Sequence, residues 1–573
     1  MIELNKSPYN LTELQIQSIK TLIDNMSIEA KIGQLFFVIG QDDEVTDLDA
    51  FIRKYQPGGM MYRPDKADKI KRQIAKIQHV SDIPLFMAAN LESGGNGIVS
   101  EGTWVGNPLQ IAATDDTELA FQLGRVAGEQ ANQVGVNMAF APIIDLDLNF
   151  RNPITNTRTY GSDVNRVQQM AKAQINGFCS EQVYPVIKHF PGDGVDERDQ
   201  HLVSSVNSLS ADEWMASYGK LYSHFIEKGV GCIMVGHIYQ PAWERQLAPE
   251  LSTEELRPAS VSKVLINGLL RDKLGFQGLA ITDATAMLGY TTIMPRKQLL
   301  VETINAGIDM ILFNKNIDED YQAIRDALSQ GTLTQTRLDE AVTRIVATKM
   351  AQGLFGDKSL QFNDDAVIMP HPDVPRKIAQ KSITLVKDRD CLLPITPQKY
   401  PRIRLVVLGD SDDGGFKEGG QVGPLFVEAL EKAGFQVTCL QPNQLDFHEI
   451  FEEGVADLKA KFDLALYVAN IETASNQTTT RLQWIPLMAA NAPWFEKEIS
   501  TVFVSTANPY HLFDVPYMST FINAYTGNPE TVQATVRKMI GQEDFTGINP
   551  VDPFCGYGDL LLQHGKKREE EGF

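Results

Sequence analysis

The stretch Val186-Ile-Lys-His-Phe-Pro-Gly-Asp-Gly-Val-Asp-Glu-Arg-Asp-Gln-His201 joins an apolar, strand-like run to a polar loop. The run ends in the pair Lys188-His189 and a Pro-Gly break, and the loop carries Asp199 and His201 two residues apart. Loops that leave the ends of core strands are where enzymes place their chemistry. An Asp beside a His can orient the imidazole and raise its proton affinity, which suits general acid/base catalysis. A charged surface loop is the competing interpretation of this spacing.

Similar apolar runs alternate with amphipathic, helix-like patterns on both sides of this stretch, from about residue 30 to residue 355. The expected strands are Gly33–Ile39, Gly59–Tyr62, Pro84–Ala89, Val136–Pro142, Val183–Lys188, Gly231–Val235, Gly278–Thr282 and Met310–Phe313. The expected helices include Asp163–Cys179, Ala211–Lys228, Ser262–Leu274 and Met294–Ala306. Repeated βα units predict a parallel sheet, and about eight of them predict a closed (β/α)8 barrel.

A second, smaller domain is predicted beyond a break at Gly353-Leu-Phe-Gly356 and a proline-rich segment, His371-Pro-Asp-Val-Pro375. A helix at 376–381 is followed by buried strand patterns at Arg404–Leu408, Leu464–Val468 and Thr501–Ser505, with helices at Pro424–Ala433 and Glu530–Ile540. This alternation is typical of a doubly wound α/β sandwich. We therefore predict an α/β protein with a catalytic barrel over residues 1–355, a linker over 356–375 and a C-terminal α/β domain over 376–573.

Two further segments of this second domain have simple interpretations. The Asp/Gly-rich loop at 409–415 has neither a GxGxxG pattern nor a Walker-type Lys, so it does not predict a phosphate site. The charged end at 566–573 is expected to be a frayed tail.

The composition excludes several classes of partner. A net charge of −21 argues against nucleic acid or an anionic membrane, because both require a basic surface. No apolar run approaches the ~20 residues that span a membrane, and the N-terminus lacks a signal pattern. The cysteines are scattered and never form a CxxC pair, so we expect reduced, buried thiols in a cytoplasmic protein: Cys179, Cys232, Cys391, Cys439 and Cys555.

Polar side chains follow five of the expected strands. They are Glu92, Asp145 with Arg158, Lys188-His189, His237 and Asp283. Barrel active sites are assembled from the C-terminal ends of several strands, so these groups predict one site. Salt bridges at the barrel mouth are the alternative role for Glu92, Asp145 and His237.

At this point the chain resembles glycoside hydrolase family 3, specifically its β-N-acetylglucosaminidase branch in the two-domain form. The resemblance runs from Lys31-Ile-Gly-Gln-Leu-Phe36 to Asn508-Pro-Tyr510. The segments that carry it are Asn152-Pro-Ile-Thr-Asn-Thr-Arg-Thr-Tyr-Gly161 (family NPxxxTRSFG), Lys188-His-Phe-Pro-Gly192 (KHFPG), Asp199-Gln-His201 (DSH), Pro258-Ala-Ser-Val-Ser262 (PASLS) and Gly275-Phe-Gln-Gly-Leu-Ala-Ile-Thr-Asp283 (LGFxGLxxTD).

The resemblance implies a retaining glycosidase with Asp283 as nucleophile and His201, held by Asp199, as acid/base. It also implies that Arg158, Lys188 and His189 grip hydroxyls of the terminal sugar. The physical logic agrees, because retention requires a carboxylate under the anomeric carbon and a proton donor beside the leaving oxygen. The family's β-glucosidase branch usually takes its acid/base from the second domain, so the Asp-His dyad makes that branch the less favoured one.

Departures from the family pattern concern sugar recognition and the dyad loop. Asn90-Leu-Glu-Ser-Gly-Gly95 stands where the family has Asp-Gln-Glu-Gly-Gly-Arg. The sugar-binding Asp is therefore Asn90, whose amide both donates and accepts, and the Arg is Gly95. In the dyad loop, the typical His, Asp and Thr are replaced by Asp193, Val195 and Asp196.

The function predicted first is exo-hydrolysis of a non-reducing terminal β-linked N-acetylglucosamine from short amino-sugar oligosaccharides, such as peptidoglycan or chitin fragments. Phosphorolysis on the same site is the second hypothesis, because a His acid/base repels phosphate less than a carboxylate does. A non-catalytic sugar-binding protein is the third. No cofactor is predicted, and no metal, because His189, His201 and His237 are not at ligand spacing. The oligomeric state is left open.

Overall fold

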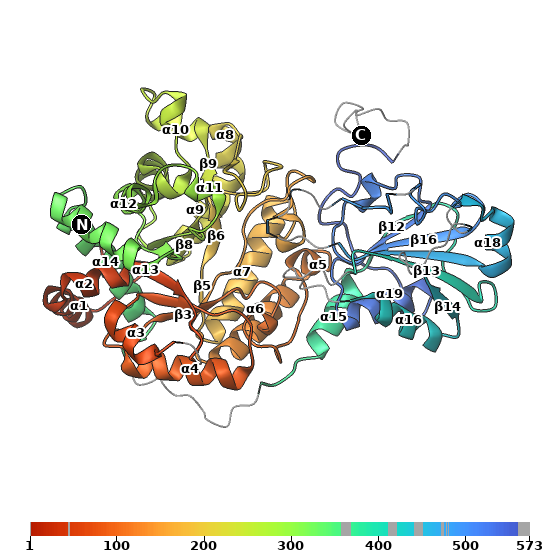
Figure 1. The fold of residues 1–573 in the computed structure, drawn as a ribbon, viewed down its shortest axis with the longest axis horizontal. Helices are drawn as coiled ribbons and strands as arrows, with labels where there is room; N and C mark the ends of the chain where they lie inside the picture. Colours follow the sequence, from red (N-terminus) through yellow and green to blue (C-terminus); the bar gives the residue numbers. More distant parts are fainter. Residues whose placement is uncertain are drawn as a thin grey trace. The chain divides into compact units, whose positions relative to one another are not determined.

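A computed structural model describes residues 2–43, 46–356, 368–410, 421–440, 448, 451–471, 475–476, 478, 481–486 and 488–559. The chain divides into two compact units (Figure 1). Unit 1 comprises Met1–Trp104, Ala120–Asn152 and Val164–His371, and unit 2 comprises Val105–Leu119, Pro153–Asp163 and Pro372–Phe573. Residues 357–367 of the predicted linker, 411–415 of the Asp/Gly-rich loop and the tail at 566–573 lie outside the described residues.

Unit 1 is built around parallel strands that follow one another in chain order. One sheet has the order β11-β1-β2-β3-β4-β5 and a second has the order β10-β8-β6. Single bridges, Ile143 to Lys188 and Ile281 to Met310, connect the neighbouring edges, so the barrel ladder is not continuous. The strands are β1 (Phe36–Ile39), β2 (Gly59–Met61), β3 (Phe86–Ala89), β4 (Met138–Ala139), β5 (Tyr184–Pro185), β6 (Ile187–Phe190), β8 (Cys232–Val235), β10 (Leu279–Thr282) and β11 (Ile311–Leu312).

Each of the eight strands predicted for this unit overlaps an observed one, and the α/β fold class is confirmed. The fifth predicted strand is divided into β5 and β6, which pair with different neighbours, β4 and β8. A short parallel pair, β7 (Ser205–Val206) with β9 (Ile238–Tyr239), joins the loop after β6 to the loop after β8.

Helices of unit 1 pack an apolar stripe against the strands. In α4, for example, Ile70, Ile74 and Ile77 are buried at spacings of three and four residues, the period of one helix face. The helices are α1 (Glu13–Asn25), α2 (Ile28–Gln34), α3 (Leu48–Tyr55), α4 (Ala67–Val80), α6 (Thr117–Gln133), α7 (Val164–Ser180), α8 (Ala211–Trp214), α9 (Lys220–Glu227), α10 (Pro241–Leu247), α11 (Leu288–Thr291), α12 (Arg296–Ala306), α13 (Ile317–Gln330) and α14 (Gln335–Ala351). The stretches η3 (Met215–Gly219) and η6 (Val264–Lys273) are π-helical.

A buried ion cluster lies just before β11, at the N-terminal end of the strands. The Asp309 carboxylate lies 2.9 Å from Arg271, 3.0 Å from Arg337 and 3.4 Å from Arg344. Burial alone would raise the pKa of Asp309, but the three guanidinium groups hold it below its ordinary value. One carboxylate therefore ties η6 and α14 to the strand ends.

Unit 2 is a six-stranded sheet with the order β12-β17-β16-β15-β13-β14, in which only the β12–β17 pair is antiparallel. Both faces of the sheet are apolar. Leu464, Leu466 and Val468 of β15 pack in one core cluster, and the alternating Ala465 and Tyr467 pack in another. The strands are β12 (Thr384–Asp388), β13 (Arg402–Leu408), β14 (Gln436–Cys439), β15 (Leu464–Ala469), β16 (Ser500–Ser505) and β17 (Thr520–Asn523).

The helices of unit 2 are α5 (Pro108–Ala112), α15 (Asp373–Ser382), α16 (Gly423–Lys432), α18 (Val455–Lys461) and α19 (Pro529–Met539). The Asp410 carboxylate accepts the backbone N–H groups of Val422 and Gly423 at 2.8 and 2.7 Å, at the start of α16. The described part of the Asp/Gly-rich loop therefore stabilises a helix N-terminus.

Two early segments of the chain belong to unit 2 by their contacts. Figure 1 shows α5, from the first of them, beside α15. Gln110 donates a side-chain hydrogen bond to Thr531 at 2.8 Å, and the backbone N–H of Ile548 donates to the Ala113 carbonyl at 3.0 Å. The predicted domain boundaries assign residues 105–119 and 153–163 to the barrel, whereas their contacts group them with the second unit.

The described residues also bear on the cysteines and on membrane insertion. All five cysteines are free, as expected, but the expected burial is wrong for Cys179 and Cys391, which are exposed, and for half-buried Cys439. Among the helices that the structure describes, none has the length and apolar character of a membrane span.

Candidate active site

Asp283 directly follows β10 at the C-terminal end of the strand. Its backbone N–H donates to the Val235 carbonyl at 2.8 Å, and its Oδ1 accepts the N–H of Ala284 at 2.7 Å. Its Oδ2 is buried and accepts no hydrogen bond from the residues that the structure describes. Burial alone would raise the pKa of Asp283, but nearby imidazoles and the Ala284 N–H hold it below its ordinary value. The result is an ionised carboxylate with one oxygen available for chemistry.

His201 and Asp199 form the predicted dyad. The Nδ1 of His201 lies 2.7 Å from Asp199 Oδ1, and the backbone N–H of His201 donates to the same oxygen at 2.8 Å. The Asp199 side chain is fully buried, while that of His201 is 21% exposed. A buried carboxylate that accepts the Nδ1–H leaves Nε2 as the ring nitrogen that Asp199 does not hold.

His189 and Asp145 form a second dyad close to Asp283. The Nδ1 of His189 lies 2.7 Å from Asp145 Oδ2, and the Nε2 of His189 lies 3.7 Å from Asp283 Oδ2. Asp145 also accepts the backbone N–H of Asp193 at 2.9 Å. Asp145 thus holds an imidazole of the candidate site in place. The sequence left open whether Asp145 is a site group or a partner in a salt bridge at the barrel mouth, and this contact has features of both.

Lys188 lies within β6, and Asn90 and Glu92 follow β3. The buried Lys188 ammonium is 2.6 Å from Glu92 Oε1, so its positive charge is paired with a carboxylate of the same site. Asn90 is exposed immediately after β3. In the dyad loop, the Asp196 carboxylate is paired with the Arg198 guanidinium at 2.6 Å.

His237 is buried beside the residue that follows Asp283. Its Nε2 lies 3.1 Å from the Ala284 carbonyl, which can only accept, so Nε2 carries the proton. Its Nδ1 then accepts from the Ser260 hydroxyl at 2.9 Å. Burial lowers the pKa of His237 to about 4, so the ring is neutral and fixes the segment that follows Asp283. Neither Ser260 nor Ala284 carries a signal in the sequence that would have marked it for this role.

Arg158 is the predicted site residue that the structure places in unit 2. It ends the short helix η2 (Asn156–Arg158), and its guanidinium donates to the Ile154 carbonyl at 3.4 Å. The other predicted residues all belong to unit 1. The roles of Arg158 and Asn90 at sugar hydroxyls stay predictions.

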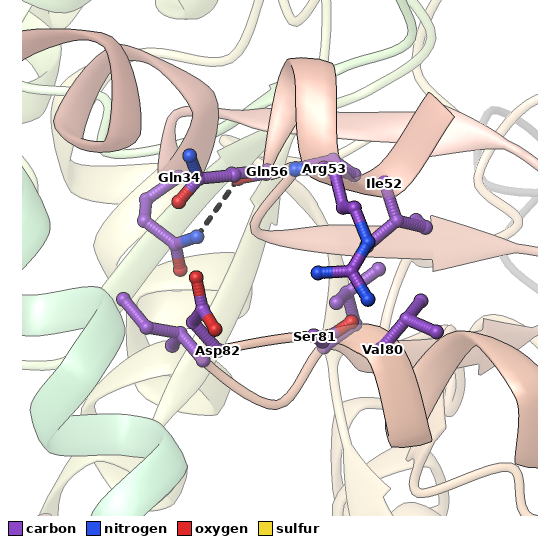
Figure 2. A pocket seen from close by; sticks show the side chains of 10 residues that line it. Gln34, Ile52, Arg53, Gln56, Val80, Ser81 and Asp82 are labelled. Atoms are coloured by element: carbon purple, nitrogen blue, oxygen red, sulfur yellow. Dashed lines mark hydrogen bonds between the residues drawn. The ribbon is translucent and has the colours of Figure 1, made fainter. Parts of the chain in front are cut away.

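A small cavity of about 170 Å³ lies at the opposite, N-terminal ends of β1 to β3. Figure 2 shows Gln34, Arg53 and Asp82 around it, with the Gln34 amide donating to the Gln56 carbonyl at 2.9 Å. The N-terminal face of a barrel carries stability rather than catalysis, so this cavity is not part of the active site. Among the described residues, no His, Cys, Asp and Glu side chains are grouped as a metal site.

At the ends of parallel strands, a buried carboxylate lies close to the imidazoles of two Asp–His dyads, an arrangement typical of an enzyme active site. Residues 27–348 match the family described as "Glycosyl hydrolase family 3 N terminal domain". A β-N-acetylglucosaminidase/β-glucosidase of Cellulomonas fimi is 41% identical over 569 residues, which cover 98% of this chain and 100% of that protein. The chain therefore belongs to glycosyl hydrolase family 3, which confirms the resemblance in its motifs.

Solved structures agree over nearly the whole chain. "Beta-glucoside phosphorylase BglX" superposes with a TM-score of 0.89 at 44% identity, covering 97% of this chain and 99% of that one. A family 3 β-N-acetylglucosaminidase from Paenibacillus sp. str. FPU-7 superposes with a TM-score of 0.76 at 23% identity, covering 92% and 99%. The second likeness shows the fold alone.

Proposed function

We propose that the enzyme removes a non-reducing terminal, β-linked gluco-configured sugar through a covalent glycosyl-enzyme on Asp283. The observation that carries this proposal is the buried Oδ2 of an ionised carboxylate, which accepts no hydrogen bond from the described residues and lies among the imidazoles of His189 and His201. N-acetylglucosamine and glucose are the sugars proposed, because the relative from Cellulomonas fimi is named for both.

The first step couples attack by Asp283 to proton transfer from His201. The Asp283 oxygen bonds to the anomeric carbon, the glycosidic bond breaks, and His201 Nε2 gives its proton to the leaving oxygen. Asp199 holds the ring at Nδ1 and stabilises its charged form. His189 and Lys188 are proposed to bind hydroxyls of the same sugar, with Asp145 and Glu92 orienting them.

Inorganic phosphate is the acceptor that we propose for the second step. A phosphate oxygen bonds to the anomeric carbon, the bond to Asp283 breaks, and a sugar 1-phosphate leaves. After the first step His201 is neutral, so it does not repel an incoming phosphate as a second carboxylate would. The likeness to a β-glucoside phosphorylase at 44% identity along almost the full chain supports this acceptor.

Hydrolysis is the second candidate, favoured by the name of the Cellulomonas fimi relative. Water must lose a proton to His201 as it attacks, whereas a phosphate dianion already presents a nucleophilic oxygen. The two acceptors share every earlier step, so only the second half of the reaction distinguishes them.

The test is product analysis with nitrophenyl β-N-acetylglucosaminide and nitrophenyl β-glucoside over a range of phosphate concentrations. We expect turnover to rise with phosphate and a sugar 1-phosphate to form. Free sugar as the product at every phosphate concentration would support hydrolysis instead. Absence of turnover on both sugars would contradict the proposed function and favour a binding protein.

A second measurement identifies the nucleophile. A slow 2-deoxy-2-fluoro sugar should leave its label on Asp283, as found by mass spectrometry of peptides, and Asp283→Ala should abolish labelling and turnover. Asp82→Asn, at the opposite end of the barrel, serves as the matched carboxylate control and should behave as the wild type. A label on Asp199, Glu92 or Asp145 would overturn the assignment.

A further inference from the structure

Asp193 is a buried carboxylate that the proposed mechanism does not use. Its Oδ1 accepts the N–H of Gly194 at 2.8 Å and the side-chain amide of Asn152 at 3.1 Å. Its Oδ2 accepts the side-chain amide of Gln200 at 3.3 Å. Every group that contacts this carboxylate in these bonds is a donor, which is the environment of an ionised acid.

Gln200 lies between the two members of the dyad, Asp199 and His201. Its Oε1 accepts the backbone N–H of His237 at 2.8 Å, at the end of β8. Because a backbone N–H can only donate, this bond fixes the orientation of the amide and turns its NH₂ group toward Asp193. A single side chain therefore connects the dyad loop to the segment beneath the nucleophile.

The charges around Asp193 come from several elements. Asp145 and Asp147 lie in the loop after β4, His189 lies on β6, and Tyr218 of η3 donates to the Asp193 carbonyl at 2.5 Å. Burial, and then the charge of Asp145, raises the pKa of Asp193 to about 6, against a smaller lowering effect of His189. The raised pKa makes Asp193 easier to protonate than an ordinary carboxyl group.

We propose that ionised Asp193 and Gln200 form a positioning pair that holds the dyad loop against the end of β8, and that proton uptake by Asp193 breaks this pair. The inference rests on the proposed role of His201 as the acid/base. Neither member of the pair contacts the reacting atoms; both act through His201 and through His237.

Protonation disrupts the pair because the new O–H of Asp193 has no acceptor among Gly194, Asn152 and the amide of Gln200. The Gln200 amide can supply one only by rotating, and it then presents its NH₂ group to the N–H of His237. Two donors face each other, so the contact at the end of β8 is lost. Activity should therefore fall as the pH falls through the pKa of Asp193.

Asp283 does not account for such an acidic limb. Its own pKa lies below the ordinary carboxyl value, so it stays ionised across this range.

The test compares pH profiles of kcat/KM, between about pH 5 and pH 8, for the wild type, for Asp193→Asn and for the double variant Asp193→Asn with Gln200→Glu. Asp193→Asn places an NH₂ group where the O–H of the protonated acid would be, so it mimics the protonated state. We expect a loss of about 10- to 100-fold at neutral pH and no acidic limb near pH 6. KM should change less than kcat.

The double variant restores the pattern of donors and acceptors. The carboxylate that Gln200→Glu introduces can accept both the N–H of His237 and the NH₂ group at position 193, so most of the lost activity should return. Circular dichroism and thermal melting verify folding, and if Asp193→Asn does not fold, the double variant carries the test. A wild-type acidic limb that persists in Asp193→Asn, or a double variant no better than the single one, would overturn the inference. Absence of a glycosyl-enzyme in the wild type at any pH would instead contradict the proposed function.

Discussion

Asp283 keeps its charge among imidazoles rather than beside a second free carboxylate. Retaining glycosidases commonly place two carboxyl groups about 5–5.5 Å apart, and the repulsion between them raises one pKa. In this chain the carboxylates of Asp145 and Asp199 lie one step further out, each behind a histidine. The lowered pKa of Asp283 suits the nucleophile proposed for it, and the proton donor proposed beside it is an imidazole rather than a second carboxylic acid.

His201→Ala should slow cleavage of disaccharides far more than cleavage of nitrophenyl glycosides. A sugar alkoxide leaves poorly without a proton, whereas a nitrophenolate leaves easily, and general acid help is worth roughly 10²–10⁴-fold. In phosphate-free buffer, where water is the acceptor and has lost its base, the variant should accumulate glycosyl-enzyme from nitrophenyl substrates and show a burst in stopped-flow traces. Azide, which needs no deprotonation, should restore part of the turnover.

The matched variant for this experiment is Asp199→Asn, which keeps the imidazole of His201 but weakens the hydrogen bond that orients it. It should give a milder form of the same pattern. Equal slowing of both substrate types by His201→Ala, without a burst, would mean that His201 binds sugar and that another group donates the proton.

The order of the barrel elements could be predicted because each barrel strand is a short apolar run followed by polar residues. The short pair β7 and β9 was missed, since two-residue strands in polar loops leave no apolar run. The edge strands β12 and β14 of unit 2 were missed as well, because their mixed burial gives no continuous apolar pattern. The contact between Asp199 and His201 could be predicted from motif spacing, because the two residues stand two positions apart in one loop.

Residues that act through a hydrogen bond at long range could not be predicted in the same way. Gln200 stands inside the dyad motif, but its partners, Asp193 and His237, are defined only by the folded loop. α5 likewise has no pattern that distinguishes a barrel segment from a segment of unit 2. Whether α5 belongs to the barrel or to unit 2 depends on contacts with residues that are hundreds of positions away in the chain.

Asp309→Asn should destabilise the protein by about 3–5 kcal/mol, because three guanidinium groups would remain buried without their counter-charge. Urea unfolding followed by tryptophan fluorescence measures this loss. Because the folded pKa of Asp309 is depressed, its contribution is present above the unfolded pKa of about 3.9 and is lost as the pH falls through the folded value.

Asp24→Asn, at an exposed position of α1, is the control for this substitution and should change stability by less than about 0.5 kcal/mol. If both variants unfold at the same urea concentration as the wild type, the cluster contributes nothing to the free energy of unfolding.

At the scale of the whole molecule, chain position does not decide which unit a residue belongs to. Residues 105–119 and 153–163, the second of which contains Arg158, are surrounded in sequence by barrel residues and pack with unit 2. Gly161 shows how close this packing is, since a Cβ at that position would lie 2.3 Å from the Pro550 carbonyl oxygen. A division of the protein into two fragments at the linker therefore also divides unit 2.

Removal of residues 372–573 should give an insoluble or partly unfolded barrel fragment, because both segments lose the partners that cover them. Co-expression of residues 372–573 as a separate polypeptide should recover soluble barrel fragment, measured by co-purification on a tag carried by one fragment only. A truncated barrel that is soluble, monomeric and natively folded by circular dichroism would contradict this expectation.

Because unit 2 is made of separate stretches of the chain, its parts leave the ribosome at different times. Gln110 emerges 421 residues before its partner Thr531. At elongation rates of about 5–20 residues per second, that delay is on the order of tens of seconds. Throughout this interval the two segments lack their packing partners. Those partners, α19 and the residues around Pro550, are translated only near the end of synthesis. A chain that terminates between these segments and α19 lacks their packing partners, so we expect chaperones or proteases to recognise it more readily than the full-length chain.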